Sequence, residues 1–395
     1  MRILHTSDWH VGRGIRGRSR AHEHQDVLAE IADIAAREQV DIVLVAGDQF
    51  DTAAPAPESE AIVYRALLDL EATGAQVVVL AGNHDNPRRW GAVKPLFEQR
   101  GFHLVDQLRR PDDGGVLRLS TAGGQVAQVA AIPWLSQREV VRSRQLMELG
   151  SGTQAAMFGD WVKRIIDRLS AGFGGDTVNV ITGHLTVAGG APPRGGAGER
   201  AAHLIFEYLV SPAAFPAMAQ YVALGHLHRP HRIESPCANV WYSGSPLMLD
   251  FGEAESDHKS VMVVEVDPGT PAEVHRVPLA SGVPLRTLRG TVEQVAALAA
   301  SVGDAHVRVE LDAAPAPGLA DTIRTVVPGT VDVRIVRPAD DADETADGDL
   351  SSVHATPTDL LREYLEVEGT DAKAIDDLVS LMTDVMEELD AADAA

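Results

Sequence analysis

Cysteine is nearly absent from this chain of 395 residues, in which Cys237 is the only one. A single cysteine excludes an internal disulfide and a zinc site built from four thiolates. Because chains without disulfides are typical of reducing compartments, we expect the protein to work in the cytoplasm.

Long hydrophobic runs are also missing, although 45% of the residues are hydrophobic, which is enough for a buried core. The first residues lead straight into a polar motif at Asp8, so the apolar segment of a signal peptide is not recognisable. No later stretch has the length that spans a bilayer. We therefore expect a protein that is neither exported nor inserted in a membrane.

Basic residues are scarce: 34 Lys and Arg stand against 57 Asp and Glu, and the net charge is -23. Such a charge is unusual for a protein that binds nucleic acid, because phosphate contacts need Lys and Arg. Much of the excess lies in residues 340–395, which contain 18 acidic residues against only Arg362 and Lys373. Since the acidity is mostly a property of this end, the net charge does not exclude a nucleic-acid enzyme.

The first part of the chain alternates short apolar runs with amphipathic segments. Residues 3–4, 42–46 and 77–81 are continuous apolar runs, which are typical of strands buried on both faces. Between them, apolar residues recur every three or four positions and predict two helices. Their apolar faces consist of Val27, Leu28, Ile31, Ile34 and Ala35 in the first helix and Ile62, Leu67, Leu68 and Leu70 in the second.

More strands and one helix are predicted downstream. The strands cover residues 126–132, 178–182, 221–224, 240–243 and 261–266, and the helix lies near residues 155–169. This order predicts an α/β fold for residues 1–283, with two mixed sheets that face each other and helices that flank them.

The pattern changes after residue 284. Short strands and a helix predict a small α+β capping module over residues 284–337. Its strands are expected at 285–288, 307–311 and 331–336, and its helix at 292–300. Residues 338–356 are acidic and nearly free of apolar side chains, which is typical of a linker.

The C-terminal segment, residues 357–395, contains an amphipathic pattern. Its apolar residues step by three and four positions, while acidic residues fill the opposite face, so the pattern predicts a helix with an apolar stripe. The stripe consists of Ile375, Leu378, Met382, Val385 and Leu389. Such a stripe needs a partner surface.

Side chains that bind metal ions follow the predicted strands, which is where open α/β sheets usually bind ligands. Five motifs carry them: Asp8 and His10 in DWH, Asp48 in GDQFD, Asn83, His84 and Asp85 in GNHD, His184 in GH, and His226 and His228 in GHLH. Carboxylate, imidazole and carboxamide ligands suit divalent ions such as Mn, Fe or Zn. One motif alone would be a weak signal, but five in this order predict a metal site.

This ordered set of motifs resembles the calcineurin-like metallophosphoesterases. The flanking stretches, among them VVVLAGNHDNP and YSGSPLMLDFGE, resemble the nuclease subunits of bacterial SbcCD-type complexes over nearly the whole chain. The resemblance implies a four-layer sandwich of two sheets between helices and an enzyme that hydrolyses phosphodiester bonds in DNA.

The resemblance also implies two divalent ions, with manganese favoured, that share the Asp48 carboxylate. One ion would be bound by Asp8, His10, Asp48 and His228, and the other by Asp48, Asn83, His184 and His226. His84 then resembles the general acid of the family, which protonates the departing sugar oxygen.

Two acidic residues beside these ligands are open to more than one interpretation. Asp85 either orients the His84 imidazole or caps a turn. Asp51 stands where archaeal and eukaryotic relatives carry His and the bacterial ones carry Asp; we interpret it as a residue behind the ligands or a structural one and leave it out of the site.

Other residues with chemical potential are given ordinary roles. Histidines outside the motifs are expected at the surface or hydrogen-bonded in the core: His5, His103, His203, His258, His275, His306 and His354. The glycine-rich residues 189–200 lack the Gly-Lys-Ser/Thr ending of a phosphate loop, so ATP binding is not expected there. Arginines near the motifs either contact a phosphate backbone or are only solvated: Arg13, Arg16, Arg18, Arg20, Arg88, Arg89 and Arg229.

Three functions are compatible with such a site. The first is a DNA endonuclease and double-strand exonuclease that processes hairpins and ends in replication, recombination and repair. The second is a small-molecule metallophosphatase or cyclic-nucleotide phosphodiesterase. The third, a non-catalytic DNA-binding scaffold, requires a broken site, whereas every ligand position here is filled by a competent residue. The module, linker and C-terminal segment favour the nuclease.

Partners follow from the same resemblance. It implies a homodimer that forms a heterotetramer with the SbcC ATPase, and it implies that residues 357–395 dock onto the coiled-coil base of SbcC. The docking face would be extended by Leu360, Leu361, Tyr364 and Leu365. The alternative is that this segment packs on its own domain.

Overall fold

The computed structural model describes residues 1–135, 157–189, 209–253, 258–336, 375 and 378–379. The chain divides into two units, Met1–Arg337 and Pro338–Ala395. In the second unit, Ile375 is buried and Leu378 is 44% exposed, and both have helical conformation. The predicted linker, the rest of the predicted C-terminal helices and the glycine-rich residues after Gly189 lie outside the described residues.

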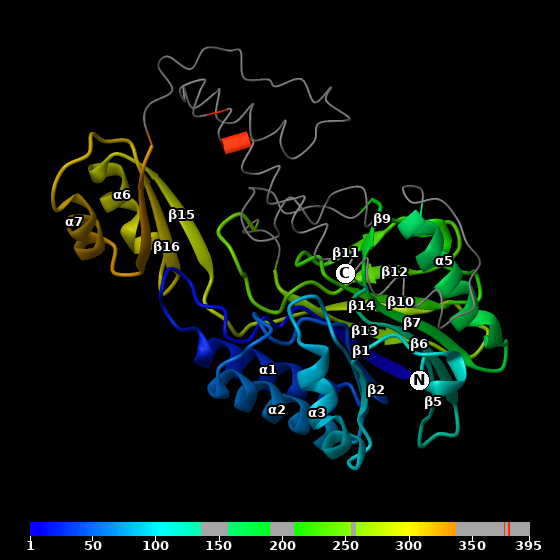
Figure 1. Cartoon of the computed structure of the whole chain (residues 1–395). Coiled ribbons are helices and arrows are strands. Elements are labelled where there is room, and N and C mark those ends of the chain that lie inside the picture. The colour runs from blue at the N-terminus through cyan, green and yellow to red at the C-terminus, as the bar shows by residue number, and fades with distance from the viewer. Residues whose placement is uncertain (136–156, 190–208, 254–257, 337–374, 376–377, 380–395) are drawn as a thin grey trace. The chain divides into compact units, whose positions relative to one another are not determined.

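The first sheet has six strands, in the order β14-β13-β1-β2-β3-β4. Its strands are β1 (Arg2–Thr6), β2 (Ile42–Val45), β3 (Gln76–Leu80), β4 (His103–Val105), β13 (Ser260–Glu265) and β14 (Glu273–Pro278). The strands β1 to β4 are parallel, and β13 and β14 are antiparallel additions (Figure 1). All four residues of β2 are buried, as its continuous apolar run predicts.

The second sheet also has six strands, in the order β11-β12-β10-β7-β6-β5. Its strands are β5 (Val116–Ser120), β6 (Val126–Ile132), β7 (Val178–His184), β10 (Tyr221–Gly225), β11 (His231–Ile233) and β12 (Val240–Tyr242). The four central strands are parallel, whereas β5 and β11 are antiparallel edges. A separate pair, β8 (Thr186–Val187) and β9 (Leu209–Val210), follows β7.

Helices cover the outer face of each sheet. They are α1 (Ala21–Arg37), α2 (Pro57–Ala72) and α3 (Pro87–Glu98) on the first sheet, and α5 (Met157–Leu169) on the second. Between the sheets lies another core, to which Ile3, Leu44 and Val78 contribute from one side and Val180 and Tyr221 from the other. This confirms the predicted fold of two facing mixed sheets flanked by helices. None of the helices in the described part of the chain is long and apolar enough to cross a membrane.

His5 shows how a polar side chain fits between the two sheets. Its Nδ1 lies 2.9 Å from the Tyr221 hydroxyl and its Nε2 lies 3.1 Å from the Leu224 carbonyl. Burial lowers the pKa of His5 to about 3, so the ring is neutral and donates to the carbonyl while it accepts from the hydroxyl. The prediction of a hydrogen-bonded core histidine is confirmed.

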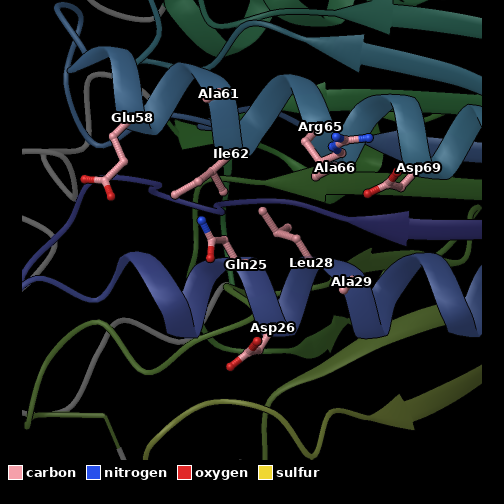
Figure 2. A pocket seen from close by; sticks show the side chains of 10 residues that line it. All are labelled: Gln25, Asp26, Leu28, Ala29, Glu58, Ala61, Ile62, Arg65, Ala66 and Asp69. Carbon is pink, nitrogen blue, oxygen red and sulfur yellow. The ribbon is translucent and has the colours of Figure 1, made fainter.

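A groove of about 550 Å³ lies between α1 and α2. Figure 2 shows Leu28 of α1 and Ile62 of α2 pointing into the space between the helices, with Glu58 and Asp69 extending from α2. None of the residues that line it is a candidate metal ligand, so the groove is separate from the predicted chemistry.

The small module is a three-stranded parallel sheet with two helices and its own core. Its elements are β15 (Leu285–Gly290), α6 (Val292–Leu298), β16 (His306–Leu311), α7 (Leu319–Val326) and β17 (Thr330–Ile335). The predicted strands and first helix are confirmed, and a capping box of Thr291 and Gln294 begins α6. The sequence did not indicate α7, because two turns are too short for a helical period to stand out.

Glu23 on α1 joins the small module to the first sheet's helices. Its carboxylate accepts hydrogen bonds from Arg20 at 2.7 and 3.0 Å and from the backbone N–H of Val283 at 3.0 Å, and it lies 2.9 Å from His306 Nε2. Burial opposes its charge, but His306 and Arg20 outweigh burial and lower the pKa of Glu23 to about 2.

We expect Glu23→Gln to lower the free energy of unfolding at neutral pH by about 2 kcal/mol, because it removes a charged acceptor with several partners. Because folding depresses the pKa of Glu23, its contribution to the free energy of unfolding is complete above pH 4.5 and is lost as the pH falls toward 2. Denaturant melts of both proteins from pH 7 to pH 3 measure this. The control Glu71→Gln breaks a more exposed pair with Arg100 and should change stability by less than about 1 kcal/mol. A constant gap between Glu23→Gln and the unaltered protein at all pH values would contradict the assignment.

Candidate metal centre

The five motifs meet at one rim of the two sheets. Asp8 and His10 follow β1, Asp48 follows β2 and Asn83 follows β3, and these strands are parallel neighbours. His184 ends β7, and His226 and His228 follow β10, its parallel neighbour in the second sheet. Because the carboxyl ends of parallel strands lie at the same edge, both sheets deliver their motifs to one place.

The backbone at this rim is held in an unusual conformation. Asp8, His10, Asp48 and His226 have positive φ angles of 53°, 45°, 53° and 102°, which side-chain-bearing residues rarely adopt. The loops are tied together by hydrogen bonds of 3.0 Å from Asp8 N to the Gly47 carbonyl and from His10 N to the Asp48 carbonyl. Strain of about 1–3 kcal/mol per residue persists only where the surrounding structure enforces it, which is common at functional sites.

Glycines allow the loops to approach one another this closely. A Cβ on Gly82 would lie 2.1 Å from Asp48 Oδ1, and one on Gly47, where φ is +97°, would lie 2.1 Å from His184 Nδ1. No side chain fits at either position, so glycine before the ligand is a steric requirement of the site.

Asp48 lies at the centre of the cluster and is almost fully buried. Its Oδ2 is 3.6 Å from His10 Nε2 and 3.4 Å from His184 Nε2, so it faces one histidine from each predicted ligand set. Burial would raise its pKa, but His184 and His10 outweigh burial and hold the pKa of Asp48 well below its usual range. Asp48 therefore lies between the two predicted ligand sets.

Asn83 is surrounded by imidazole nitrogens. Its Oδ1 lies 2.9 Å from His184 Nε2 and 3.1 Å from His226 Nδ1. His184 Nδ1 lies 2.8 Å from the Ala46 carbonyl, to which it donates, so Nε2 is the nitrogen that faces Asn83 and Asp48. Burial lowers the pKa of His184, but the Asp48 carboxylate outweighs burial and raises it to about 9. A site that favours a proton this strongly also favours a metal cation at the same nitrogen.

The other predicted ligand set, Asp8, His10, Asp48 and His228, also brings carboxylates and imidazole nitrogens together. His10 Nε2 and His228 Nε2 face each other at 3.1 Å, and Asp8, His10 and His228 can all direct ligand atoms to within 4.8 Å of one another. Asp8 is held in place by the Ser7 hydroxyl at 2.5 Å and the His226 N–H at 2.9 Å. Burial raises the pKa of Asp8, and the Asp48 carboxylate adds to the rise although His184 opposes it.

The residues present therefore fit divalent metal ions. Two buried carboxylates, several imidazole nitrogens and a carboxamide oxygen converge here, and buried carboxylates need positive charge beside them. The donor set is the one that borderline to hard divalent ions prefer. The structure brings together all of the ligands that the sequence predicts: Asp8, His10, Asp48, Asn83, His184, His226 and His228.

His84 lies beside the ligands but is oriented differently. Its Nδ1 donates to the Asp51 carbonyl at 2.7 Å, and its backbone N–H donates to Asp48 Oδ1 at 2.8 Å. The ring packs edge-on against His10 with centroids 4.7 Å apart. Because Nδ1 has a partner, Nε2 is the nitrogen that can hold a proton toward a bound substrate.

The structure decides between the two roles of Asp85. Its carboxylate accepts hydrogen bonds from the backbone N–H groups of Gly82, Gln49 and Phe50 at 2.8, 3.3 and 3.1 Å. It therefore caps the turn and joins the second and third motif loops. Burial and the nearby Asp48 raise the pKa of Asp85 to about 7.

Asp51 supports the site from behind. Its Oδ1 lies 3.4 Å from His10 Nδ1 and 3.2 Å from Arg13 Nη1, and its carbonyl accepts from His84. These contacts agree with the interpretation of Asp51 as a residue behind the ligands. It orients both a ligand and the candidate acid.

Two residues near the site were not identified from the sequence. The Trp134 ring lies 5.1 Å from the His226 ring and 6.0 Å from the His184 ring, measured between centroids, and so covers the second ligand set. Lys259 is buried and donates to the His228 carbonyl at 3.1 Å and to the Ser245 hydroxyl at 2.9 Å. The position of Trp134 just after β6, at the same rim, was the available signal; nothing local marked Lys259.

The arginines near the motifs differ in their contacts and exposure. Arg13, Arg20 and Arg89 have intramolecular partners, namely Asp51, Glu23 and Glu60. Arg18 and Arg88 are exposed. Arg16 pairs with Asp332 of the small module.

The chain belongs to the calcineurin-like phosphoesterase family, whose sequence profile matches residues 1–230. That range contains all five motifs.

Three relatives are similar over most of the chain, and each is named as the SbcD component of the nuclease SbcCD. The Bacillus subtilis protein is 32% identical over 100% of both chains. The Rhodobacter capsulatus protein is 35% identical over 73% of this chain and 71% of its own, and the Escherichia coli K12 protein is 30% identical over 75% and 73%. Among phosphoesterases the chain is thus a member of the SbcD family. It is a metal-dependent hydrolase that acts on phosphodiester bonds.

We expect Gly82→Ala to weaken Mn²⁺ binding at least about tenfold, because the new Cβ displaces Asp48 from the ligand cluster. Isothermal titration calorimetry with MnCl₂ measures the change. Gly175→Ala is the matched control, because a Cβ there meets no atom within 4 Å. Equal affinities of Gly82→Ala and the unaltered protein would show that Asp48 is not a ligand.

Proposed function

We propose that the chain is a metal-dependent DNA nuclease, an endonuclease and double-strand exonuclease that processes hairpins and DNA ends during replication, recombination and repair. The observation that carries the proposal is Asp48, which faces ligands from both sheets while its Oδ1 holds the backbone of His84. The relatives named as part of the nuclease SbcCD support nucleic acid as the substrate.

Two ions, most consistent with Mn²⁺, are assigned to the two ligand sets. Asp8, His10, Asp48 and His228 would hold one ion, and Asp48, Asn83, His184 and His226 would hold the other. When bound, a pair of divalent ions acidifies a water molecule and stabilises charge on the phosphate oxygens.

His84 is the catalytic residue of the chain itself. Its ring is fixed by the hydrogen bond from Nδ1 to the Asp51 carbonyl, and in the imidazolium form Nε2 carries a second proton that faces away from this carbonyl. In the reaction this proton passes to the sugar oxygen as the bond between phosphorus and that oxygen breaks.

A pair of variants separates metal binding from proton transfer. We expect Asp48→Ala to lose Mn²⁺-dependent cleavage of both a DNA hairpin and bis-p-nitrophenyl phosphate. His84→Ala should lose about 10²–10⁴-fold on DNA, yet keep most of its turnover of the nitrophenyl ester, whose leaving group departs without a proton. Cleavage is measured with and without EDTA, and His275→Ala, an exposed histidine on β14, is the control.

Other outcomes of the same assay point elsewhere. Efficient turnover of the small ester together with intact DNA would support a small-molecule phosphodiesterase. If His84→Ala lost the same fraction of its activity on DNA and on the nitrophenyl ester, His84 would not be the general acid.

We further propose that residues 284–337 form a DNA-contacting domain, that residues 357–395 dock onto an SbcC-type ATPase, and that the chain acts in the cytoplasm as a homodimer within a heterotetramer. The name of the relatives, which makes them one component of SbcCD, supports the partnership. The exposed Leu378 lies on the predicted apolar stripe and is a point of access to it.

Deletion of residues 357–395 should abolish co-elution with the SbcC protein from the same organism in size-exclusion chromatography and leave Mn²⁺-dependent cleavage of single-stranded DNA intact. Leu378→Asp should weaken the complex, whereas Leu298→Asp, which alters an equally exposed leucine on α6, should not. Unchanged co-elution of the deletion variant would refute docking through this segment.

A further inference from the structure

Asp332 on β17 is shared by three arginines. Its Oδ2 lies 3.0 Å from Arg308 Nε, 3.1 Å from Arg334 Nε and 3.0 Å from Arg16 Nε. One carboxylate neutralises one of these three positive charges, so the cluster carries an excess of positive charge. Here we call these four residues the Asp332 cluster.

Arg308 is the buried member of this cluster. It is 6% exposed, and its Nη2 has no hydrogen-bond partner among the described residues. Its guanidinium carbon lies 4.3 Å from the centre of the Phe251 ring, which fixes the plane of the group. The buried guanidinium adds a positive charge that Asp332 does not balance for all three arginines, although its enclosed nitrogen is not accessible to a ligand.

Arg16 and Arg334 open the cluster to solvent. Their side chains are 44% and 45% exposed, whereas Arg308 is enclosed beneath them. Asp332 holds the guanidinium groups together although their charges repel, and so keeps them oriented before a ligand arrives. An anion with several oxygens is the ligand that such a group of planar donors matches.

The position of Arg16 relates the cluster to the metal centre. Arg16 has a φ of 48° and lies at the tip of a turn in which Ile15 and Arg18 exchange backbone hydrogen bonds of 2.9 Å. It follows the ligand His10 by six positions, so its Cα lies within about 20 Å of that of His10. Because the charge spacing along one strand of a duplex is about 3.4 Å, a distance of about 20 Å corresponds to roughly six nucleotides along the strand.

We propose that Arg16 and Arg334, which are gathered on Asp332 together with the buried Arg308, form a binding site for one backbone phosphate of the nucleic-acid strand that is cut at the metal centre. The inference rests on the proposed nuclease function and adds an anchor for the substrate. Because Arg16 belongs to the loop after the first metal motif and the other two arginines belong to the small module, a bound phosphate also ties the module to that loop.

The test is the salt dependence of DNA binding, measured by fluorescence anisotropy with a labelled duplex at a series of KCl concentrations. We expect Arg16→Gln/Arg334→Gln to bind about tenfold more weakly. The association constant falls with salt, so the slope of its logarithm against log [KCl] is negative. This slope should become less steep by about 0.9 for the one lost phosphate contact. Arg16→Lys/Arg334→Lys keeps both charges, so it should keep the slope while losing part of the affinity.

The control variant is Arg324→Gln on α7. Arg324 belongs to the same module, is 53% exposed and pairs with Asp321 at 3.0 Å, but it is not part of the Asp332 cluster. The DNA affinity of Arg324→Gln and the salt dependence of its DNA binding should stay unchanged. Melting temperatures of all variants confirm that they are folded, and Arg308 is left intact because it is buried.

The outcomes distinguish this inference from the proposed function. An unchanged slope in the double Gln variant, with normal DNA cleavage by the unaltered protein, overturns the phosphate site and leaves the nuclease standing. A rise in melting temperature with inorganic phosphate that Arg334→Gln abolishes, without a change in slope, indicates a site for free phosphate and also overturns it. If the unaltered protein hydrolyses bis-p-nitrophenyl phosphate but neither binds nor cuts DNA, the proposed substrate fails and this inference fails with it.

Discussion

Two carboxylates buried where two sheets meet impose the constraint on which the rest of this structure depends. Asp8 and Asp48 have almost no exposed surface, and a buried negative charge is tolerated only beside a compensating positive one. The surrounding histidines supply ligand nitrogens but no permanent charge. The raised pKa of His184 shows that the surroundings of Asp48 favour a positive charge. Divalent ions would supply that charge.

The backbone around these carboxylates is strained, and contacts with neighbouring loops hold it in place. Positive φ angles at ligand residues require the ties between motif loops that Asp85 and the close glycine contacts provide. Arg13 and Lys259 make further contacts behind the candidate ligands. Arg13 connects Asp51, which lies beside His10, to the Leu249 carbonyl, and Lys259 connects the His228 backbone to Ser245. One loop of residues 244–253 therefore steadies His10 and His228, which belong to the same predicted ligand set.

The metal centre accounts for phosphodiester hydrolysis, while the choice of substrate depends on what surrounds it. The same ligands can act on a small ester or on a polymer, because the ions contact only the phosphate. The features that we propose for contact with a polymer lie outside the sandwich. They are the small module, its junction at Glu23, and the arginines that gather on Asp332. This separation explains how a shared phosphoesterase centre serves different substrates by altering its attachments.

The sequence by itself indicated the inner strands of both large sheets and the order of the five motifs with their candidate ligands, because each of these has a local pattern. It did not indicate the edge strands β4, β5, β11 and β14. A strand buried on both faces reads as a continuous apolar run, and β2 is one. Only the tertiary structure decided that Asp85 caps a turn, that Arg20 serves Glu23 while Arg16 faces the module, and that Trp134 and Lys259 support the ligands. The physical reason is that these roles depend on partners far away in the chain, such as Arg16 and Asp332, and no local period or spacing carries information about a contact made across the fold.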